Sequence, residues 1–410
     1  MTLDTKTTAE TGAKAPVPTK ARRVSLGSLQ QLTIVALWAA LCVVSILHSN
    51  EPALWLGNLL KYAAGIGIVA CGMTFVMVGG GFDLSVGSIV AVCGVTAVLM
   101  MKPLAGAAPL LAISVATAVT VCVGLVLGAM NGAVIARVGV NPFVVTLSSM
   151  FIFRGMGLVV THGGQSQVVP QSLYKSYYKV YWGQVVVPGL YVPPWALTAA
   201  GVLVGMLLLV KLTRLRFRWP RLNLPAWTLA LALLILGLLF ALDYTKLGDA
   251  FTGLKIATPV LVFAAVFIAS VYTLNFTRFG HYVYATGGNE RASWLAGVST
   301  KGVTLATYVV SGLVCAITGV ILTALNCSAE ASSAYQGMEM IVIASVIVGG
   351  TPLGGGQGGL FRTLAGLLLL CTIDKLLTDF GVGAQYRQIV TGLMIVTVVA
   401  VDTVVKRSNK

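Results

Sequence analysis

Long apolar runs separated by short polar segments are the feature of this sequence that most restricts its fold. A helix needs about 20 apolar residues to cross the hydrocarbon core of a bilayer, which is about 30 Å thick. About twelve runs reach or approach that length, and they are residues 29–47, 59–78, 85–101, 109–135, 142–161, 195–212, 226–242, 255–275, 303–326, 338–350, 359–378 and 388–405. Because helices satisfy their own backbone hydrogen bonds in lipid, we predict an all-α, polytopic transmembrane helical bundle of about 10–12 spans.

Composition and charge agree with a membrane protein. Hydrophobic residues make up 57% of the chain and charged residues 10%. The net charge of +15 could indicate nucleic acid, but the basic residues cluster at the ends of apolar runs without an interleaved aromatic face. We therefore expect no nucleic-acid partner, and the positive-inside rule places both termini in the cytoplasm. Scattered cysteines without a CxxC pair and isolated histidines predict neither a disulfide framework nor a metal site.

The apolar runs also suggest a division of the chain. We expect a cytoplasmic N-terminal tail at 1–28, a transmembrane domain at 29–405 that begins with an uncleaved span, and a cytoplasmic tail at 406–410. Within the transmembrane domain, 213–242 reads as an inserted basic connector and helix, and 276–302 as a cytoplasmic loop. The outer side would then carry 162–194, whose tyrosines fit an interfacial belt slightly better than a sugar-stacking surface.

Glycine-rich segments interrupt the apolar runs at two comparable places. Residues 79–87 and 349–359 each follow a run that ends in Val-Gly-Gly and precede another run. Discontinuous helices at matched positions are typical of transporters with internal repeats. A separate glycine stripe, Gly124, Gly128 and Gly132, recurs every four residues on one helical face and predicts close packing against another helix.

Several catalytic and nucleotide-binding motifs are missing from the sequence. There is no GxxxxGK[ST] and no Gly-Lys pair, so the chain lacks the P-loop that cradles ATP phosphates. Gly354, Gly356 and Gly359 match GxGxxG, but neither a preceding strand nor a following acidic residue supports a dinucleotide site. Since GxSxG and HExxH are also absent, we predict no catalytic residues, and any ATP would be hydrolysed by a partner.

Charged residues inside apolar runs are the candidates for function. Ionisable groups in the hydrocarbon region cost several kcal/mol unless they are paired or hydrated. The charges at or within the runs are Asp83, Arg154, Glu339, Asp374, Lys375 and Asp402. We predict that Asp83, Ser85, Arg154 and Glu339 line the substrate pathway, although Asp83 and Glu339 would equally suit the positive starts of helices. Lys375 and Asp402 could instead lie at the interface.

A polar island at residues 287–298 separates two long apolar runs. Asn289 can cap a short helix, Glu290 suits its first turn, and Gly297 can end it in the left-handed conformation. Helical spacing puts Trp294, Leu295 and Val298 on one side. That apolar face could pack on the chain itself or dock on another protein, and the spacing does not decide between them.

Several motifs together resemble the permease subunits of ribose, galactose and xylose ABC importers. They are the segments 81–87, 153–155, 287–292, 339–351 and 386–402, in the order seen in that family, and the resemblance covers most of 55–405. The insertion at 213–242 is most similar to the longer xylose-type members. Phe82 and the pair Phe361-Arg362 depart from the usual pattern, which leaves the sugar open.

The resemblance implies a transport subunit of the bacterial cytoplasmic membrane that works by alternating access. Its partners would be a second copy of the permease, a cytoplasmic sugar-import ATPase that holds ATP and Mg²⁺, a periplasmic sugar-binding protein and membrane lipid. No cofactor is expected in this chain. The segment that would couple to the ATPase comprises Gly288, Asn289, Glu290, Arg291, Trp294, Leu295 and Val298. An ion-coupled sugar transporter that works alone, and a membrane enzyme or scaffold, remain alternatives.

Overall fold

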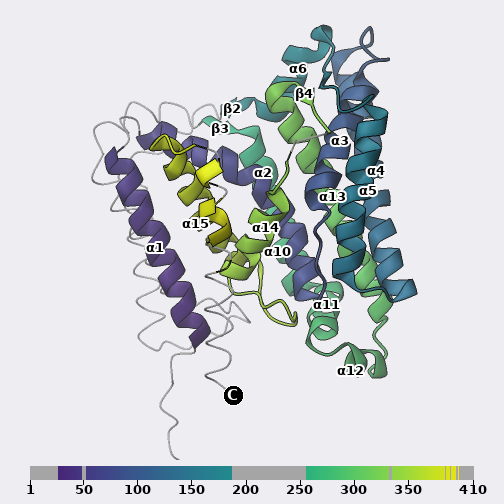
Figure 1. Cartoon of the computed structure of the whole chain (residues 1–410), viewed down its shortest axis with the longest axis vertical. Helices are drawn as coiled ribbons and strands as arrows, with labels where there is room; N and C mark the ends of the chain where they lie inside the picture. The colour runs from purple at the N-terminus through teal and green to yellow at the C-terminus, as the bar shows by residue number, and fades with distance from the viewer. Residues whose placement is uncertain are drawn as a thin grey trace, which may run out of the picture.

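The computed structural model describes residues 26–48, 52–186, 255–331, 335–383, 385–387, 389–393 and 396. The predicted spans at 195–212 and 226–242, most of the run at 388–405 and the two predicted tails lie outside these residues, apart from 26–28. The prediction of an all-α bundle is confirmed for the described chain (Figure 1). Five of its helices are long and apolar enough to cross a membrane, and three shorter apolar helices accompany them.

Most of the described helices follow the predicted runs. The described helices are α1 Leu26–His48, α2 Pro52–Val78, α3 Val86–Met101, α4 Pro109–Ala133 with a π-helical turn Val134–Val138, α5 Pro142–Val160, α6 Gln171–Trp182, α10 Thr258–Phe276, α11 Arg278–Gly288, α12 Glu290–Leu295, α13 Thr300–Asn326, α14 Met338–Val348 and α15 Leu360–Asp379. Of these, α6, α11 and α12 are additional to the predicted runs. Two antiparallel pairs of short strands join distant segments: β1 Gln167–Val168 pairs with β4 Ser328–Ala329, and β2 Gln184–Val186 with β3 Lys255–Ala257.

Connectivity separates the bundle into two ends. The pairing of β1 with β4 and of β2 with β3 gathers the segment after α5, the start of α10 and the end of α13 at one end. The chain then descends α10 and forms α11 and α12 at the opposite end before α13 returns (Figure 1). Segments 162–186 and 277–299 therefore lie on opposite sides of any membrane that the bundle crosses.

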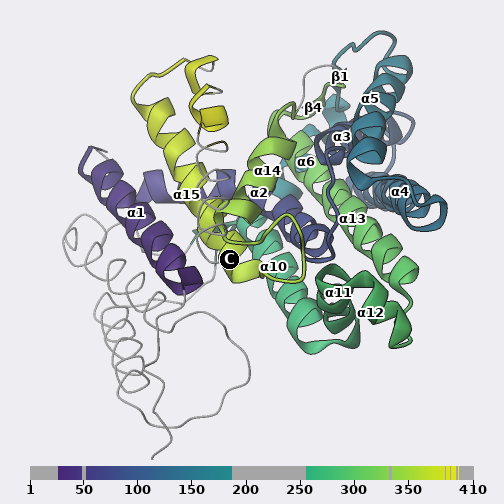
Figure 2. The ribbon, with the colours of Figure 1, turned by 60° about the horizontal axis from the view of Figure 1, so that its bottom comes forward.

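Helix α13 is the central helix of the bundle and packs against α2, α3 and α4. The predicted glycine stripe of α4 faces it, because a Cβ on Gly124 would lie 2.6 Å from the Cβ of Ala316 and one on Gly128 only 3.0 Å from the Cα of Gly312. The prediction of close helix packing at this stripe is confirmed. Helices α4 and α5 form one flank of the bundle, and α1 with α15 forms the other (Figure 2).

The tyrosine-rich segment after α5 forms helix α6, which we did not predict. Tyr177 is fully buried and donates a hydrogen bond of 2.8 Å to the carbonyl of Val320, while the indole of Trp182 donates to the carbonyl of Ile321. Tyr174 and Tyr178 of the same helix are exposed. Some of the aromatic residues therefore anchor this end of α13, and only the exposed ones can form an interfacial belt.

The contact between α4 and α13 predicts a stability effect. In Gly128→Ala, the new methyl group would overlap the carbonyl oxygen of Tyr308. We therefore expect overpacking to lower the free energy of unfolding by about 1–3 kcal/mol. The midpoint of thermal unfolding in detergent, followed by tryptophan fluorescence, measures it. Gly57→Ala on α2 is the control, because its Cβ meets no described atom within 4 Å. Equal midpoints for the two variants would contradict the packing role.

Candidate functional site

The site is built around the loop 79–85, where the chain leaves α2, turns inside the bundle and begins α3. Its backbone groups find partners within the protein: the amide of Gly81 donates to the carbonyl of Val76 at 2.8 Å. The hydroxyl of Tyr308 on α13 accepts from the amide of Phe82 at 3.2 Å and donates to the carbonyl of the same residue at 2.8 Å. These bonds let a non-helical segment lie among membrane helices.

Asp83 is the buried acid of this loop, with a relative exposure of 1%. One carboxylate oxygen accepts from the amide of Ser85 at 2.9 Å and from its hydroxyl at 2.6 Å, and the other accepts from the hydroxyl of Ser311 at 3.0 Å. Ser311 lies about 16 Å along α13 from Thr300 at 1.5 Å per residue, so the carboxylate is well inside the bundle. Asp83 thus joins the break to the central helix.

The hydrogen-bond chain extends to two residues that our sequence analysis missed. The hydroxyl of Ser149 on α5 donates to the side-chain oxygen of Asn131 at 2.5 Å, and the amide of Asn131 on α4 donates to the hydroxyl of Ser85 at 2.8 Å. Every donor in this chain is directed toward the carboxylate of Asp83, an order in which successive bonds strengthen one another. The sequence signal for Asn131 is a neutral amide inside an apolar run, which is less unusual there than a charge.

Glu339 lies in the first turn of α14 and is also buried, at 8% exposure. One of its carboxylate oxygens accepts from the amide of Gly337 at 3.1 Å. The other lies beside α3, because a Cβ on Gly87 would be only 2.5 Å from it. The starts of α3 and α14 therefore adjoin, and both acids occupy the positive ends of helices. The structure brings three of the four predicted pathway residues to this place, which we call the polar centre: Asp83, Ser85 and Glu339.

Arg154, the fourth predicted pathway residue, lies on α5 and is partly buried. The buried stripe of α5 includes Ser149 and Phe153, and Phe151 and Ile152 are exposed. Because consecutive residues of an α-helix are about 100° apart, Arg154 points to the side of this stripe. It does not share the helix position that carries Ser149 into the polar centre.

The two predicted glycine breaks both lie between helices. The first separates α2 from α3, and residues 349–359 separate α14 from α15. The start of α14 adjoins the start of α3, because Glu339 in the first turn of α14 lies beside Gly87. The glycines of 349–359 allow close backbone contacts with other segments. The internal repeat that the two breaks suggest stays a prediction.

Helix α12 confirms the predicted caps of the polar island. The side-chain oxygen of Asn289 accepts from the amide of Ala292 at 2.9 Å, and Gly297 ends the helix with a φ of 84°. Trp294 is 65% exposed and Leu295 72% exposed. Val298 departs from the prediction, because it is partly buried against the cluster that contains Val283 and Val303 and does not share the exposed face.

The segment leading into α12 is more ordered than the predicted loop at 276–302. It forms α11, which begins after Thr277, whose hydroxyl oxygen accepts from the amide of Gly280 at 3.3 Å. Val283 is the buried apolar residue of this helix. Gly288, Asn289, Glu290 and Arg291, the other predicted coupling residues, are all exposed at the junction of α11 and α12.

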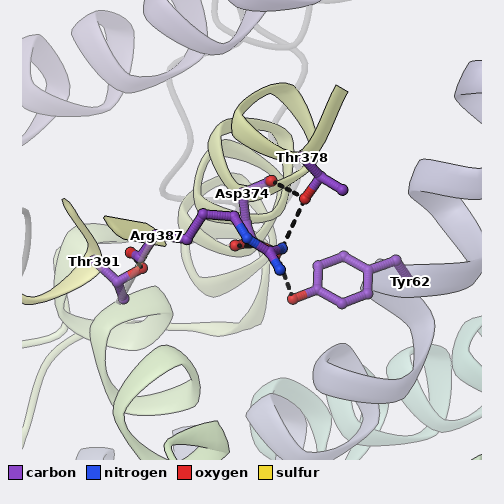
Figure 3. Close-up of polar contacts among 5 residues, drawn as sticks. All are labelled: Tyr62, Asp374, Thr378, Arg387 and Thr391. Atoms are coloured by element: carbon purple, nitrogen blue, oxygen red, sulfur yellow. Dashed lines mark hydrogen bonds and ion pairs between the residues drawn. The ribbon is translucent and has the colours of Figure 1, made fainter. Parts of the chain in front are cut away.

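A second polar cluster lies at the other end of α15 (Figure 3). Asp374 accepts from the hydroxyl of Tyr62 at 2.9 Å and pairs with Arg387 at 3.5 Å, while Arg387 also donates to the hydroxyl of Thr378 at 2.7 Å. Lys375 pairs with Asp379 one turn later. Both charges that the sequence placed inside this apolar run are therefore paired. Asp374 joins α15 to α2 and to the segment that follows α15, whereas Lys375 pairs within α15.

The chemistry of the polar centre is that of hydrogen bonding. Its groups are carboxylates, hydroxyls and an amide, which can exchange hydrogen bonds with a hydroxyl-rich solute. Within the described part of the chain, no group of three or more His, Cys, Asp or Glu side chains could hold a metal ion. The cysteines are free thiols.

The hydrogen-bond chain predicts that Asn131 stabilises the centre. Leucine in Asn131→Leu has a similar volume but leaves the hydroxyls of Ser85 and Ser149 each without one partner. We therefore expect the free energy of unfolding to fall by about 1–2 kcal/mol. Thermal unfolding in detergent measures it. Asn275→Leu on α10 is the control, because the exposed Asn275 bonds only to the carbonyl of Val271 among the contacts seen here. A midpoint equal to that of this control would mean that the hydrogen bonds of Asn131 contribute nothing to the stability of the protein.

Comparisons with known proteins agree with a transport subunit. The family described as branched-chain amino acid transport system / permease component matches residues 55–399. The chain is 30% identical over 379 residues to the ribose import permease protein RbsC of Bacillus subtilis, covering 92% of this chain and 94% of that protein. It is also 30% identical over 405 residues to the xylose transport system permease protein XylH of Escherichia coli, covering 97% and 98%.

No solved structure matches the chain. The relatives are transport permeases rather than enzymes, which argues against a membrane enzyme or a scaffold. They also favour the importer interpretation over an ion-coupled transporter that works alone. With the helical bundle, the family match over most of the sequence establishes that this chain belongs to the permease components of the branched-chain amino acid transport system type.

Proposed function

We propose that this chain is the permease subunit of an ATP-driven importer that moves a monosaccharide, either a pentose such as xylose or a related hexose, across a bacterial cytoplasmic membrane. The support for a sugar is similarity over nearly the full length to permeases named for ribose and xylose. A branched-chain amino acid is the second candidate, because the family description names it. A periplasmic binding protein would deliver the substrate, and a second copy of the permease in the lipid bilayer would complete the pathway.

Coupling to ATP is assigned to α12, and this helix is the observation that carries the proposal. It exposes Trp294 and Leu295 at the end of the bundle, and the charges of Glu290 and Arg291 are exposed in its first turn. An aromatic and an aliphatic anchor on a capped helix suit insertion into a groove of a partner. ATP and Mg²⁺ would be bound by that partner, a cytoplasmic ATPase, and not by this chain.

The substrate pathway is assigned to Asp83, Ser85, Glu339 and Arg154. The first three adjoin at the starts of two short helices, where hydroxyl, carboxylate and backbone groups are available at membrane depth. In the conformation described, Asp83 is fully engaged with Ser85 and Ser311, so it would serve the substrate only after these bonds exchange. Arg154 would contribute from the flank of α5.

The proposed orientation places 162–186 outside and α12 in the cytoplasm. Ser172 on α6 and Arg291 on α12 are both exposed, and these two helices lie at opposite ends of the bundle (Figure 1). In a cysteine-free background, an impermeant maleimide added to intact spheroplasts should label Ser172→Cys, and Arg291→Cys only after permeabilisation. The reverse pattern would overturn the orientation and remove α12 from the cytoplasm.

The docking role of α12 is tested in the reconstituted transporter with its ATPase and binding protein. The unmodified complex should hydrolyse ATP faster with xylose or ribose, and leucine in a parallel series tests the second candidate. Leu295→Asp should abolish co-purification of the ATPase, because burial of a leucine contributes about 1.5–3 kcal/mol that a buried carboxylate would reverse.

Leu353→Asp is the matched control, since Leu353 is also exposed but lies in the loop before α15. It should retain the ATPase. Normal co-purification of the Leu295→Asp variant would show that the apolar face of α12 does not bind the ATPase.

A further inference from the structure

Three backbone segments meet at the C-terminal ends of α2 and α11 without side chains between them. A Cβ on Gly287, in the last turn of α11, would overlap the carbonyl oxygen of Val78 and lie 2.7 Å from the amide nitrogen of Gly356. A Cβ on Gly355 would lie 2.7 Å from the Cα of Gly80. We call this contact of 78–80, 287–288 and 355–356 the glycine junction.

Directional bonds and packing hold the junction together. The amide of Gly356 donates to the carbonyl of Val78 at 2.8 Å, and the hydroxyl of Tyr284 on α11 donates to the carbonyl of Gly358 at 3.1 Å. Val283 packs beneath them in one apolar cluster with Val78 and Leu360. The end of α2, the end of α11 and the loop before α15 therefore form one contact unit.

The position of the junction connects both regions of the proposed site. Gly288 is followed directly by Asn289, the cap of α12, so the junction is the base of the docking helix. Gly80 is followed by the loop that carries Asp83 and leads into α3, and Gly356 is followed by the start of α15. A side chain can absorb a displacement by changing its rotamer, whereas a backbone atom cannot. Direct backbone contacts therefore transmit a displacement from one segment to the next more completely than side-chain contacts do.

We propose that Gly287, Gly355 and Gly356 are positioning residues for coupling. They clamp the pair α11–α12 onto both glycine-rich loops, so that displacement of α12 moves the start of the 79–85 break and the start of α15 as one body. This proposal rests on the proposed docking of the ATPase at α12, and it specifies how that docking reaches the polar centre.

Two buried hydroxyls lie close to the junction in the sequence. Thr286 precedes Gly287 and Thr351 follows Gly350, and within the described chain neither hydroxyl has a hydrogen-bond partner. An unpaired buried hydroxyl destabilises the conformation that contains it. The described conformation of the junction therefore carries this cost.

The test compares two glycine variants in the transporter assembled with its ATPase and binding protein in proteoliposomes. Gly287→Ala inserts a methyl group into the junction, whereas a Cβ on Gly57 of α2, which belongs neither to the junction nor to the coupling segment, meets no described atom within 4 Å. We expect Gly287→Ala to retain the ATPase and basal ATP hydrolysis. Its stimulation by xylose-loaded or ribose-loaded binding protein should fall about tenfold, with uptake falling in parallel. Gly57→Ala should behave as the unmodified protein.

Equal stimulation in the two alanine variants would overturn the proposal. Loss of ATPase co-purification in Gly287→Ala, as expected for Leu295→Asp, would also overturn it, because the junction would then only shape the docking surface. If Gly287→Ala does not insert into the membrane, Tyr284→Phe decides: it removes only the hydrogen bond to Gly358 and should lower stimulation without loss of the ATPase. Failure of the proposed function itself would be evident in the unmodified transporter, which would show no stimulation at all.

Discussion

The rest of this structure depends on one constraint: away from water, polar groups must find partners within the protein. The chain breaks its helical hydrogen bonding at 79–85, and the hydroxyl of Tyr308 on α13 compensates by bonding to both backbone groups of Phe82. Asp83 accepts from Ser85 and Ser311, and Asn131 extends this order to α5. A break that would be costly in lipid is thereby tolerated beside the central helix, where a transport pathway needs polar groups.

Glycine serves the same architecture in a second way. Between membrane helices there is little hydrophobic driving force, so close backbone approach and van der Waals contact become important. Gly124 and Gly128 use this approach to seat α4 on α13, which stabilises the bundle. Gly287 and Gly356 use it where chain segments turn, at the base of the docking helix. The residue type is shared, but only the second set lies between elements that the proposed cycle must move together.

Part of the candidate site was predictable from local sequence. The caps of α12 depend on residues within one or two turns, Asn289 and Gly297, and both predictions are confirmed. Asp83 and Glu339 were identifiable because a charge in an apolar run is unusual. Asn131, Ser149 and Ser311 were missed, since neutral polar residues are common in membrane helices. Val298 was assigned to the wrong face, because a residue after the end of a helix does not follow its periodicity.

The sequence by itself determined a membrane-embedded helical bundle, the bounds of most described helices, the capped helix α12 and, with the family match, the kind of transport subunit. These properties depend on composition, run length and contacts between near neighbours. Only the tertiary structure decided which distant residues meet: Ser311 reaches Asp83 across 228 positions, and Tyr284 reaches Gly358 across 74. It also decided that the start of α14 lies beside the start of α3, which the spacing of the glycine-rich segments does not predict. Helical periodicity specifies a face for each helix but not the partner that the face will meet, and that choice depends on packing the whole bundle.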